Sequence, residues 1–128
     1  MEKARILVVE DNPDNRGLVC FLLEGAGFQV LQAEDGRQAL EIARKEPPDL
    51  VLLDMSIPEV DGWTVASRLK TASETRSICV VALTGHTLPG DRKKALDSGC
   101  DGYISKPLDV PNFVSQVTAY LDKRPKSS

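Results

Sequence analysis

The sequence contains no apolar run approaching the ~20 residues that a membrane-spanning helix needs. Its first residues, Met1–Arg5, lead into a strand-like segment and do not form a secretory signal. We therefore expect a cytoplasmic protein with no membrane partner. Neither sign of charge dominates, because 16 Lys and Arg residues are balanced by 19 Asp and Glu residues, for a formal net charge of −3. This balance lacks the basic field that holds nucleic acid, so no direct nucleic-acid partner is expected.

Cysteine and histidine are also scarce. Cys20, Cys79 and Cys100 are odd in number and have no CxxC spacing, so we expect buried, unbridged thiols and no redox or metal role. His86 is the single histidine. Without a second histidine or a cysteine cluster, a zinc site has little support, and His86 is expected to be a solvated loop residue.

Length and composition indicate one ordinary globular domain. The chain has 128 residues, of which 41% are hydrophobic and 27% charged. A chain of this size buries enough surface for a core without disulfides or metals as staples. We predict a single domain over residues 1–122 and a short polar tail over 123–128, without internal repeats or a linker.

Short β-branched runs alternate with segments of helical period. Strands are predicted over 4–10, 28–33, 49–54, 78–83 and 101–105. Helices are predicted over 12–25, from 35 to the Pro47–Pro48 pair, and over 62–71, 91–97 and 109–122. The alternation is typical of repeated βαβ units, so the predicted fold is α/β, with a doubly wound five-stranded parallel sheet and helices on both faces.

Apolar positions indicate which helix faces pack on this sheet. In the first helix, Asn12 is predicted to be the N-cap, and Leu18, Phe21 and Leu22 are expected to face the core. In the last helix the inner face is predicted to hold three apolar residues one turn apart, namely Phe113, Val117 and Leu121.

Polar residues follow four of the predicted strands. At the end of the first strand stand Glu10 and Asp11, and at the end of the third stands Asp54. Thr84 comes at the end of the fourth strand, and Lys106 at the end of the fifth. In a parallel sheet these ends meet at the edge where open α/β folds bind ligands. Each residue alone has a plainer interpretation as a helix cap, a strand end or a solvated lysine. Together they predict a site for a divalent cation and a phosphoryl group.

The chain resembles, over nearly its whole length, the receiver domain of bacterial two-component response regulators, the CheY-like superfamily. The resemblance rests on Glu10–Asp11, on Leu52-Leu53-Asp54 followed by a loop to Gly62, on Thr84, and on Tyr103-Ile104-Ser105-Lys106-Pro107. The family often has Asp where this chain has Glu10, which keeps the charge on a longer arm. The resemblance implies a flavodoxin-like fold with strand order 2-1-3-4-5.

The resemblance also implies a chemistry. Asp54 would be the phosphoacceptor, and Lys106 and Thr84 would meet charge on the phosphoryl oxygens. Mg²⁺, with Mn²⁺ as an alternative, would be held by Glu10, Asp11, Asp54 and the backbone carbonyl of Ser56. Such a protein is a signalling switch and not an enzyme in the usual sense. Ser56 and His86 would flank the route of hydrolytic water.

A conformational switch is implied as well. Thr84 would move toward the phosphoryl group and Tyr103 would turn inward, which changes the surface of helix four, strand five and helix five. The family usually has a cis bond before the proline, so one is predicted at Lys106–Pro107.

The implied partners are a histidine kinase or a histidine phosphotransfer domain, docking beside the first helix, and a downstream protein target on the switch surface. The docking loops would be those around Asn12, Asp14, Pro58 and Pro107. A monomer or a weak phosphorylation-dependent dimer is expected. A single-domain regulator is favoured over a receiver excised from a hybrid kinase or larger regulator.

Two other function classes fit the sequence poorly. A phosphatase of the haloacid-dehalogenase type needs a second Asp two residues after the nucleophile, where this chain has Ser56. A nucleotide-binding fold needs a phosphate-cradling loop after the first strand, where Glu10 and Asp11 would instead repel phosphate.

Overall fold

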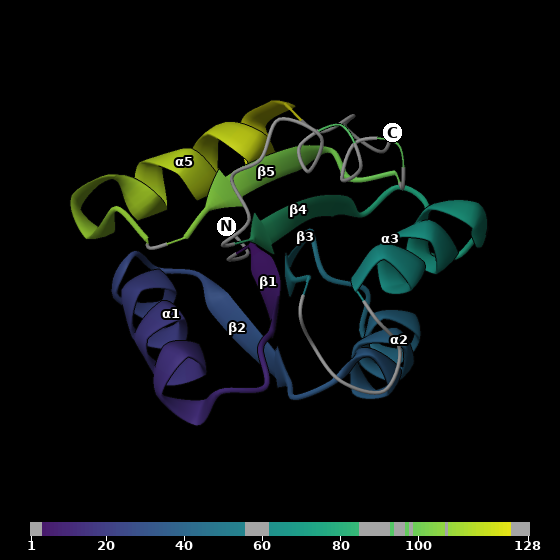
Figure 1. The fold of residues 1–128 in the computed structure, drawn as a ribbon, viewed down its shortest axis with the longest axis horizontal. Helices are drawn as coiled ribbons and strands as arrows, with labels where there is room; N and C mark the ends of the chain where they lie inside the picture. The colour runs from purple at the N-terminus through teal and green to yellow at the C-terminus, as the bar shows by residue number, and fades with distance from the viewer. Residues whose placement is uncertain are drawn as a thin grey trace.

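The computed structural model describes residues 4–55, 62–84, 93, 97, 99–106 and 108–123. This part of the chain contains five strands and four helices (Figure 1). The strands are β1 (Arg5–Val9), β2 (Gln29–Ala33), β3 (Leu50–Asp54), β4 (Cys79–Thr84) and β5 (Gly102–Ser105). The helices are α1 (Pro13–Gly25), α2 (Gly36–Lys45), α3 (Gly62–Thr71) and α5 (Val110–Lys123).

The strands form one parallel sheet in the order β2-β1-β3-β4-β5, which confirms the predicted topology. Every residue of β3 and β4 is buried. The uninterrupted apolar sequence of β3 correctly indicated a central strand covered on both faces. Asp54 is the polar exception, and it lies at the carboxyl end of this buried strand.

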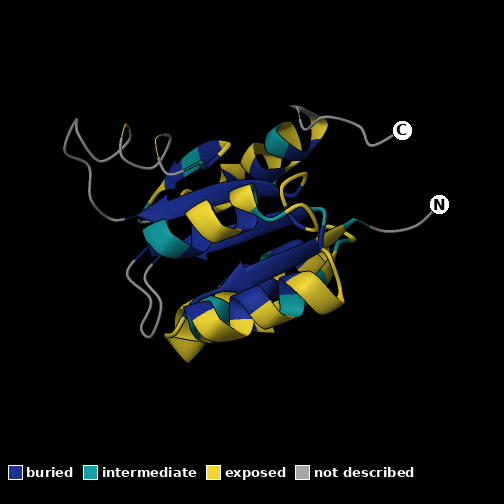
Figure 2. Ribbon diagram, turned by 90° about the vertical axis from the view of Figure 1, so that its right-hand side faces the viewer, coloured by how far each residue is buried: buried dark blue, intermediate teal, exposed yellow. Residues whose placement is uncertain are grey.

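Helices cover both faces of the sheet (Figures 1 and 2). The alternation of side chains along each strand divides the core into two clusters. One cluster joins the strands to α2 and α3 and includes Leu40, Val65 and Leu69. The other joins the strands to α1 and α5 and includes Leu23 and Phe113. The doubly wound α/β architecture is therefore confirmed.

The α1 helix begins where the sequence predicted, but it presents a different face to the core. Asn12 caps it, and the Asn12 side-chain oxygen accepts hydrogen bonds from the Asp14 and Asn15 backbone N–H groups. The prediction that Leu18 and Phe21 face the core is wrong, since they are 43% and 74% exposed. Leu22 is half-buried. The residues buried in their place are Val19, Cys20 and Leu23.

Other predictions of burial are confirmed. Phe113, Val117 and Leu121 of α5 are buried. All three cysteines are free and buried.

None of the helices in the described ranges combines the length and the apolar character that a bilayer span requires.

Several predictions fall on residues that the structure does not describe. Of the predicted helix over 91–97, residues 93 and 97 are described, and both are helical. Ser56, Pro58, His86 and the peptide bond to Pro107 lie outside the described residues, as do residues 124–128 of the predicted tail.

Candidate functional site

Three carboxylates meet at the carboxyl edge of β1 and β3. Glu10 directly follows β1, Asp54 ends β3, and the two strands are neighbours in the sheet. One carboxylate oxygen from each of Glu10, Asp11 and Asp54 lies within 4.8 Å of the other two. Glu10 and Asp54 are each only 3% exposed, whereas Asp11 is exposed. The predicted convergence of these residues is thus present in the fold.

Lys106, which directly follows β5, brings a positive charge into this cluster. Its Nζ lies 2.8 Å from Asp54 Oδ2 and 3.2 Å from Glu10 Oε1, and it donates hydrogen bonds to both. Its backbone N–H donates to the Thr84 carbonyl at 2.8 Å, which ties it to the end of β4. Burial lowers the pKa of Lys106, but the hydrogen bond and charge of Asp54, with the charge of Glu10, raise it overall. The lysine is therefore a firmly protonated cation.

The buried carboxylates are not fully compensated by this cation. Burial, followed by a hydrogen bond to Asp54 and the charge of Asp54, raises the pKa of Glu10 from the ordinary 4.5 to about 7. The Lys106 charge and the Asn12 backbone N–H act in the opposite direction. Lys106 thus offsets only part of the carboxylate charge. A divalent cation bound among these oxygens would offset the rest, and carboxylate oxygens are the ligands that Mg²⁺ prefers.

Arg16 positions this cluster, and the sequence analysis did not single it out. Its Nη1 donates to the Glu10 carbonyl oxygen at 2.9 Å, and its Nε donates to Gln32 Oε1 at 3.1 Å. Its Nη2 lies 3.6 Å from Glu34 Oε1. Arg16 therefore fixes the backbone at Glu10 from the first turns of α1. The available signal was its position one turn after the Asn12 cap, on a helix that begins at the site.

Thr84 and Tyr103 lie on the two strands that carry the rest of the site. Thr84 ends β4, is 2% exposed and pairs in register with Ser105, the residue before Lys106. Tyr103 of β5 is half-buried and packs against the core cluster beneath α2 and α3. Tyr103 lies on the strand where the sequence predicted it, and Thr84, predicted to follow the strand over 78–83, is the last residue of β4.

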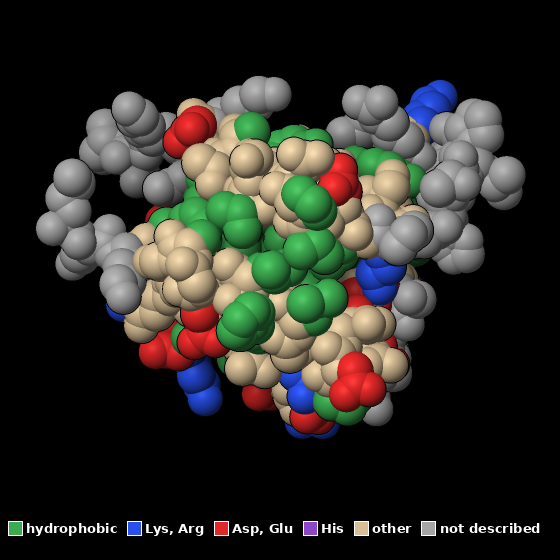
Figure 3. All heavy atoms as spheres, turned by 90° about the vertical axis from the view of Figure 1, so that its left-hand side faces the viewer, with side chains coloured by type: hydrophobic (Ala, Val, Ile, Leu, Met, Phe, Trp, Pro, Cys, Tyr) green, Lys and Arg blue, Asp and Glu red, His purple; other side chains and the backbone are tan. Residues whose placement is uncertain are grey.

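A cavity of about 560 Å³ adjoins the cluster. Glu10 and Lys106 line it on the side of the site, with Asn15 of α1. The remaining lining is apolar: Leu18, Val19, Leu83, Leu108 and Val110. Figure 3 views this side of the molecule and shows hydrophobic side chains gathered near the middle of the face. The acidic cluster thus opens beside an apolar surface formed by α1 and the start of α5.

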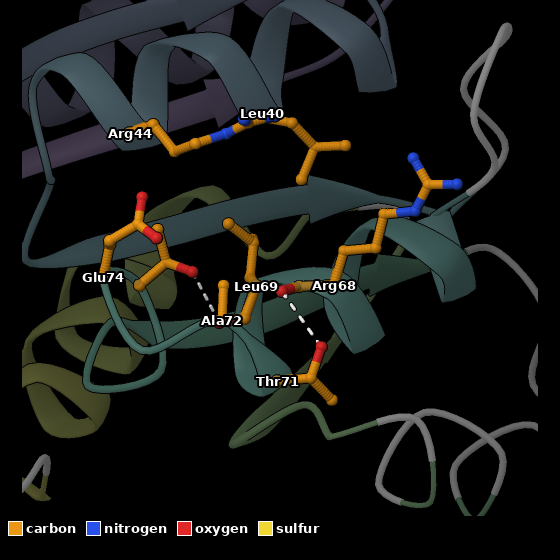
Figure 4. A pocket seen from close by; sticks show the side chains of 8 residues that line it. Leu40, Arg44, Arg68, Leu69, Thr71, Ala72 and Glu74 are labelled. Carbon is orange, nitrogen blue, oxygen red and sulfur yellow. Dashed lines mark hydrogen bonds between the residues drawn. The ribbon is translucent and has the colours of Figure 1, made fainter.

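A second cavity, of about 290 Å³, lies between α2 and the end of α3 (Figure 4). Its lining combines positively and negatively charged, polar and apolar residues: Leu40, Arg44, Arg68, Leu69, Thr71, Ala72, Glu74 and Thr75. Inside it, the Thr75 hydroxyl donates to the Leu69 carbonyl at 2.6 Å. This cavity shares no residue with the acidic cluster.

Comparison with known proteins identifies this arrangement. The sequence model of the response regulator receiver domain matches residues 6–118. The chain belongs to this family. Receiver domains work in two-component signalling, where they interact with histidine kinases and downstream targets. The family resemblance drawn from the motifs is confirmed.

Individual relatives agree with this assignment. The polar-differentiation response regulator DivK of Brucella anthropi is 40% identical over 116 residues, covering 91% of this receiver domain chain and 94% of DivK. The chemotaxis response regulator CheY4 of Vibrio cholerae has a TM-score of 0.88 at 26% identity, with 93% and 99% of the two chains covered. The receiver domain of a sensor histidine kinase from Pseudomonas aeruginosa has a TM-score of 0.87 at 29% identity, covering 95% and 100%. That structure holds a magnesium ion coordinated in its active site cleft.

Proposed function

We propose that this receiver domain accepts a phosphoryl group on Asp54 from a phosphohistidine of a histidine kinase or a histidine phosphotransfer domain. The observation that carries the proposal is the position of Asp54. Its carboxylate ends the central strand, is 3% exposed, and has Lys106 Nζ at 2.8 Å and the Glu10 and Asp11 carboxylates beside it. A helix cap would need only backbone N–H donors, and a structural ion pair would need only Lys106; neither needs two further carboxylates.

In the proposed reaction a carboxylate oxygen of Asp54 attacks phosphorus, and the bond between phosphorus and the imidazole nitrogen breaks. The electron pair of that bond stays on the imidazole, and Asp54 becomes an acyl phosphate. Lys106, whose ammonium already touches Asp54, would hold a phosphoryl oxygen as charge shifts onto the transferred group. Thr84 would donate its hydroxyl to another phosphoryl oxygen.

The acidic cluster fits a bound Mg²⁺. Asp11 and Asp54 are the proposed direct ligands, Glu10 would act partly through water, and the Ser56 carbonyl, outside the described residues, would complete the protein ligands. When bound, the ion would supply positive charge to the phosphoryl oxygens and to the crowded carboxylates. The magnesium ion of the Pseudomonas aeruginosa relative supports this assignment. Mn²⁺, which also accepts oxygen ligands, is the alternative.

Thr84 and Tyr103 are the proposed switch residues. A phosphoryl group on Asp54 would draw Thr84 toward it and let Tyr103 turn inward, which biases an existing two-state equilibrium. The altered surface would comprise β5, α5 and the helix predicted over 91–97. A downstream protein would read that surface.

The proposed docking surface for the phosphoryl donor is the exposed side of α1 together with the start of α5. Leu18, Phe21 and Val110 are the large hydrophobic side chains that are exposed in the described part of the chain. Two of them, Leu18 and Val110, line the cavity that reaches Glu10 and Lys106. A donor helix packed there would bring its phosphohistidine to the site. Exposed apolar patches of this kind mark protein interaction sites.

The test is intact and peptide mass spectrometry after incubation with acetyl phosphate, with and without Mg²⁺. One added phosphoryl group is expected, dependent on Mg²⁺ and lost in Asp54→Asn. Asp49→Asn is the matched control, because Asp49 lies at the opposite end of the same strand, where its Oδ2 accepts from the Arg5 backbone N–H at 2.8 Å. Labelling that survives in Asp54→Asn, or that disappears in Asp49→Asn, would contradict the assignment.

A further inference from the structure

The side chain of Tyr120, on α5, closes the open edge of β5. This strand has a single neighbour in the sheet, β4, so its other edge would present unpaired backbone groups. At Tyr103 that edge is occupied by one hydroxyl. The Tyr103 N–H donates to Tyr120 Oη at 3.2 Å, and Tyr120 Oη donates to the Tyr103 carbonyl at 3.1 Å. One phenol thus takes the place of a neighbouring strand, which phenylalanine could not do.

The ring of Tyr120 also lies directly on the β5 backbone. A Cβ added at Gly102 would come within 2.6 Å of Tyr120 Cδ1 and Cζ, closer than real contacts allow. Gly102 is therefore required by the ring and not by its own backbone conformation, since the positive φ angles of described glycines occur at Gly27 and Gly99. The ring is therefore packed between α5 and the β5 backbone, two elements that lie beside each other in Figure 1.

The backbone of Tyr120 is held from β4 as well. The Cys79 thiol donates to the Tyr120 carbonyl at 3.8 Å. Tyr120 therefore contacts β4 through its backbone carbonyl and β5 through its hydroxyl. Its hydroxyl contacts the backbone of the strand that leads to Lys106 and the acidic cluster.

We propose that Tyr120 is a positioning residue of the switch, whose hydroxyl couples the β5 backbone at Tyr103 to α5. The inference rests on the proposed function, and it names the contact through which that function reaches α5. Tyr103 lies three residues before Lys106, which is fixed to Asp54 by its side chain and to Thr84 by its backbone. A shift of this short segment on phosphorylation would strain both Tyr120 hydrogen bonds unless α5 moved with it.

Tyr120→Phe is the sharpest test, because it keeps the ring on Gly102 and removes only the hydroxyl. Thr118→Val is the matched control: the Thr118 hydroxyl lies on the same helix, but it donates to the Val114 carbonyl within α5. The probe is Mg²⁺ with beryllofluoride, a stand-in for the phosphoryl group. The readout is the change in amide chemical shifts at the site and along α5.

In the wild-type protein and in Thr118→Val, amides of both the site and α5 should shift when beryllofluoride is added. In Tyr120→Phe, the site amides should shift as before, while the α5 response is lost. A merely structural role would lower the melting temperature and leave the α5 response intact. The Tyr103 amide should also exchange with solvent slowly in the wild-type protein and much faster in Tyr120→Phe.

An unchanged α5 response in Tyr120→Phe would overturn the inference and leave the proposed function standing. So would a wild-type protein in which the site responds and α5 does not. Absence of any response at Asp54 in the wild-type protein would instead overturn the proposed function, and this inference with it.

Discussion

Lys106 acts on the site in two opposing ways, and one substitution separates them. Its ammonium lies among the carboxylates that would hold Mg²⁺, so it would compete with the ion, and in the proposed reaction it would also hold the transferred group. Lys106→Met should therefore raise Mg²⁺ affinity, by about tenfold or ~1.4 kcal/mol. It should slow labelling by acetyl phosphate by ~100-fold, as the loss of one charge-stabilising donor does. Calorimetric titration and an intact-mass time course measure the two effects.

The control for this substitution is Lys45→Met, since Lys45 is exposed at the end of α2. It should leave both quantities unchanged. If Lys106→Met weakened Mg²⁺ binding, the lysine would be organising the carboxylates and not competing with the ion.

The raised pKa of Glu10 predicts how the stability of the folded protein changes with pH. The pKa of Glu10 is raised to about 7 in the folded protein, against 4.5 ordinarily, so the unfolded chain loses this proton first. Between pH 4.5 and about pH 7 the folded protein holds this proton more tightly than the unfolded chain, so the contribution of Glu10 to stability falls as pH rises. Mg²⁺ binding favours the deprotonated form, so the stabilisation by Mg²⁺ should grow through the same range. Thermal denaturation at pH 5 to 8, with and without Mg²⁺, measures both trends.

Glu10→Gln should flatten both trends, because its amide does not titrate. Exposed Glu41→Gln, on α2, should not affect them. Equal pH trends in Glu10→Gln and the wild-type protein would assign the titration to another group.

At the scale of single elements, two glycines in helices should respond oppositely to alanine. At Gly62, which begins α3, a Cβ would lie 2.6 Å from Met55 Cα, and Met55 directly follows Asp54. Gly62→Ala should therefore reduce the free energy of unfolding by about 1–3 kcal/mol. At Gly17, inside α1, a Cβ would meet nothing within 4 Å, so Gly17→Ala should add about 0.5–1 kcal/mol. Urea denaturation measures both, and a stable Gly62→Ala would show that α3 can shift away from Met55.

The elements also show which features a sequence can predict. The alternation of strands and helices, the capping of α1 and the burial of Phe113 followed from periodicity and end signals, because these act over a few residues. The order of the strands in the sheet came from the family resemblance. The convergence of Asp54 and Lys106 followed from topology alone. The inner face of α1 was not predicted correctly. Apolar residues surround much of that helix, and the larger Phe21 was expected in the core, whereas the smaller Cys20 is buried there. Contacts of long side chains, such as Arg16 with the Glu10 carbonyl, depend on tertiary placement that no local pattern records.

At the scale of the whole molecule, the exposure of Phe21 on α1 predicts how the protein meets its phosphoryl donor. Phe21 is 74% exposed on the side of the protein where an apolar surface adjoins the acidic cluster. If a phosphoryl donor docks there, its protein surface needs Phe21, whereas acetyl phosphate does not. Phe21→Ser should slow phosphotransfer from the histidine kinases of the same organism by ~10-fold or more, as loss of an aromatic anchor does. Labelling by acetyl phosphate should stay at the wild-type rate.

Arg37→Ser is the matched control, because Arg37 is exposed on α2, which covers the opposite face of the sheet. It should change neither rate. Both variants replace exposed side chains, so each should keep its unfolding free energy within about 0.5 kcal/mol of the wild-type value. If Phe21→Ser slowed labelling equally with the kinases and with acetyl phosphate, Phe21 would affect the phosphoryl transfer itself and not the docking of the kinase. Unchanged transfer from every kinase would move the docking surface away from α1, to loops on the other side of the acidic cluster.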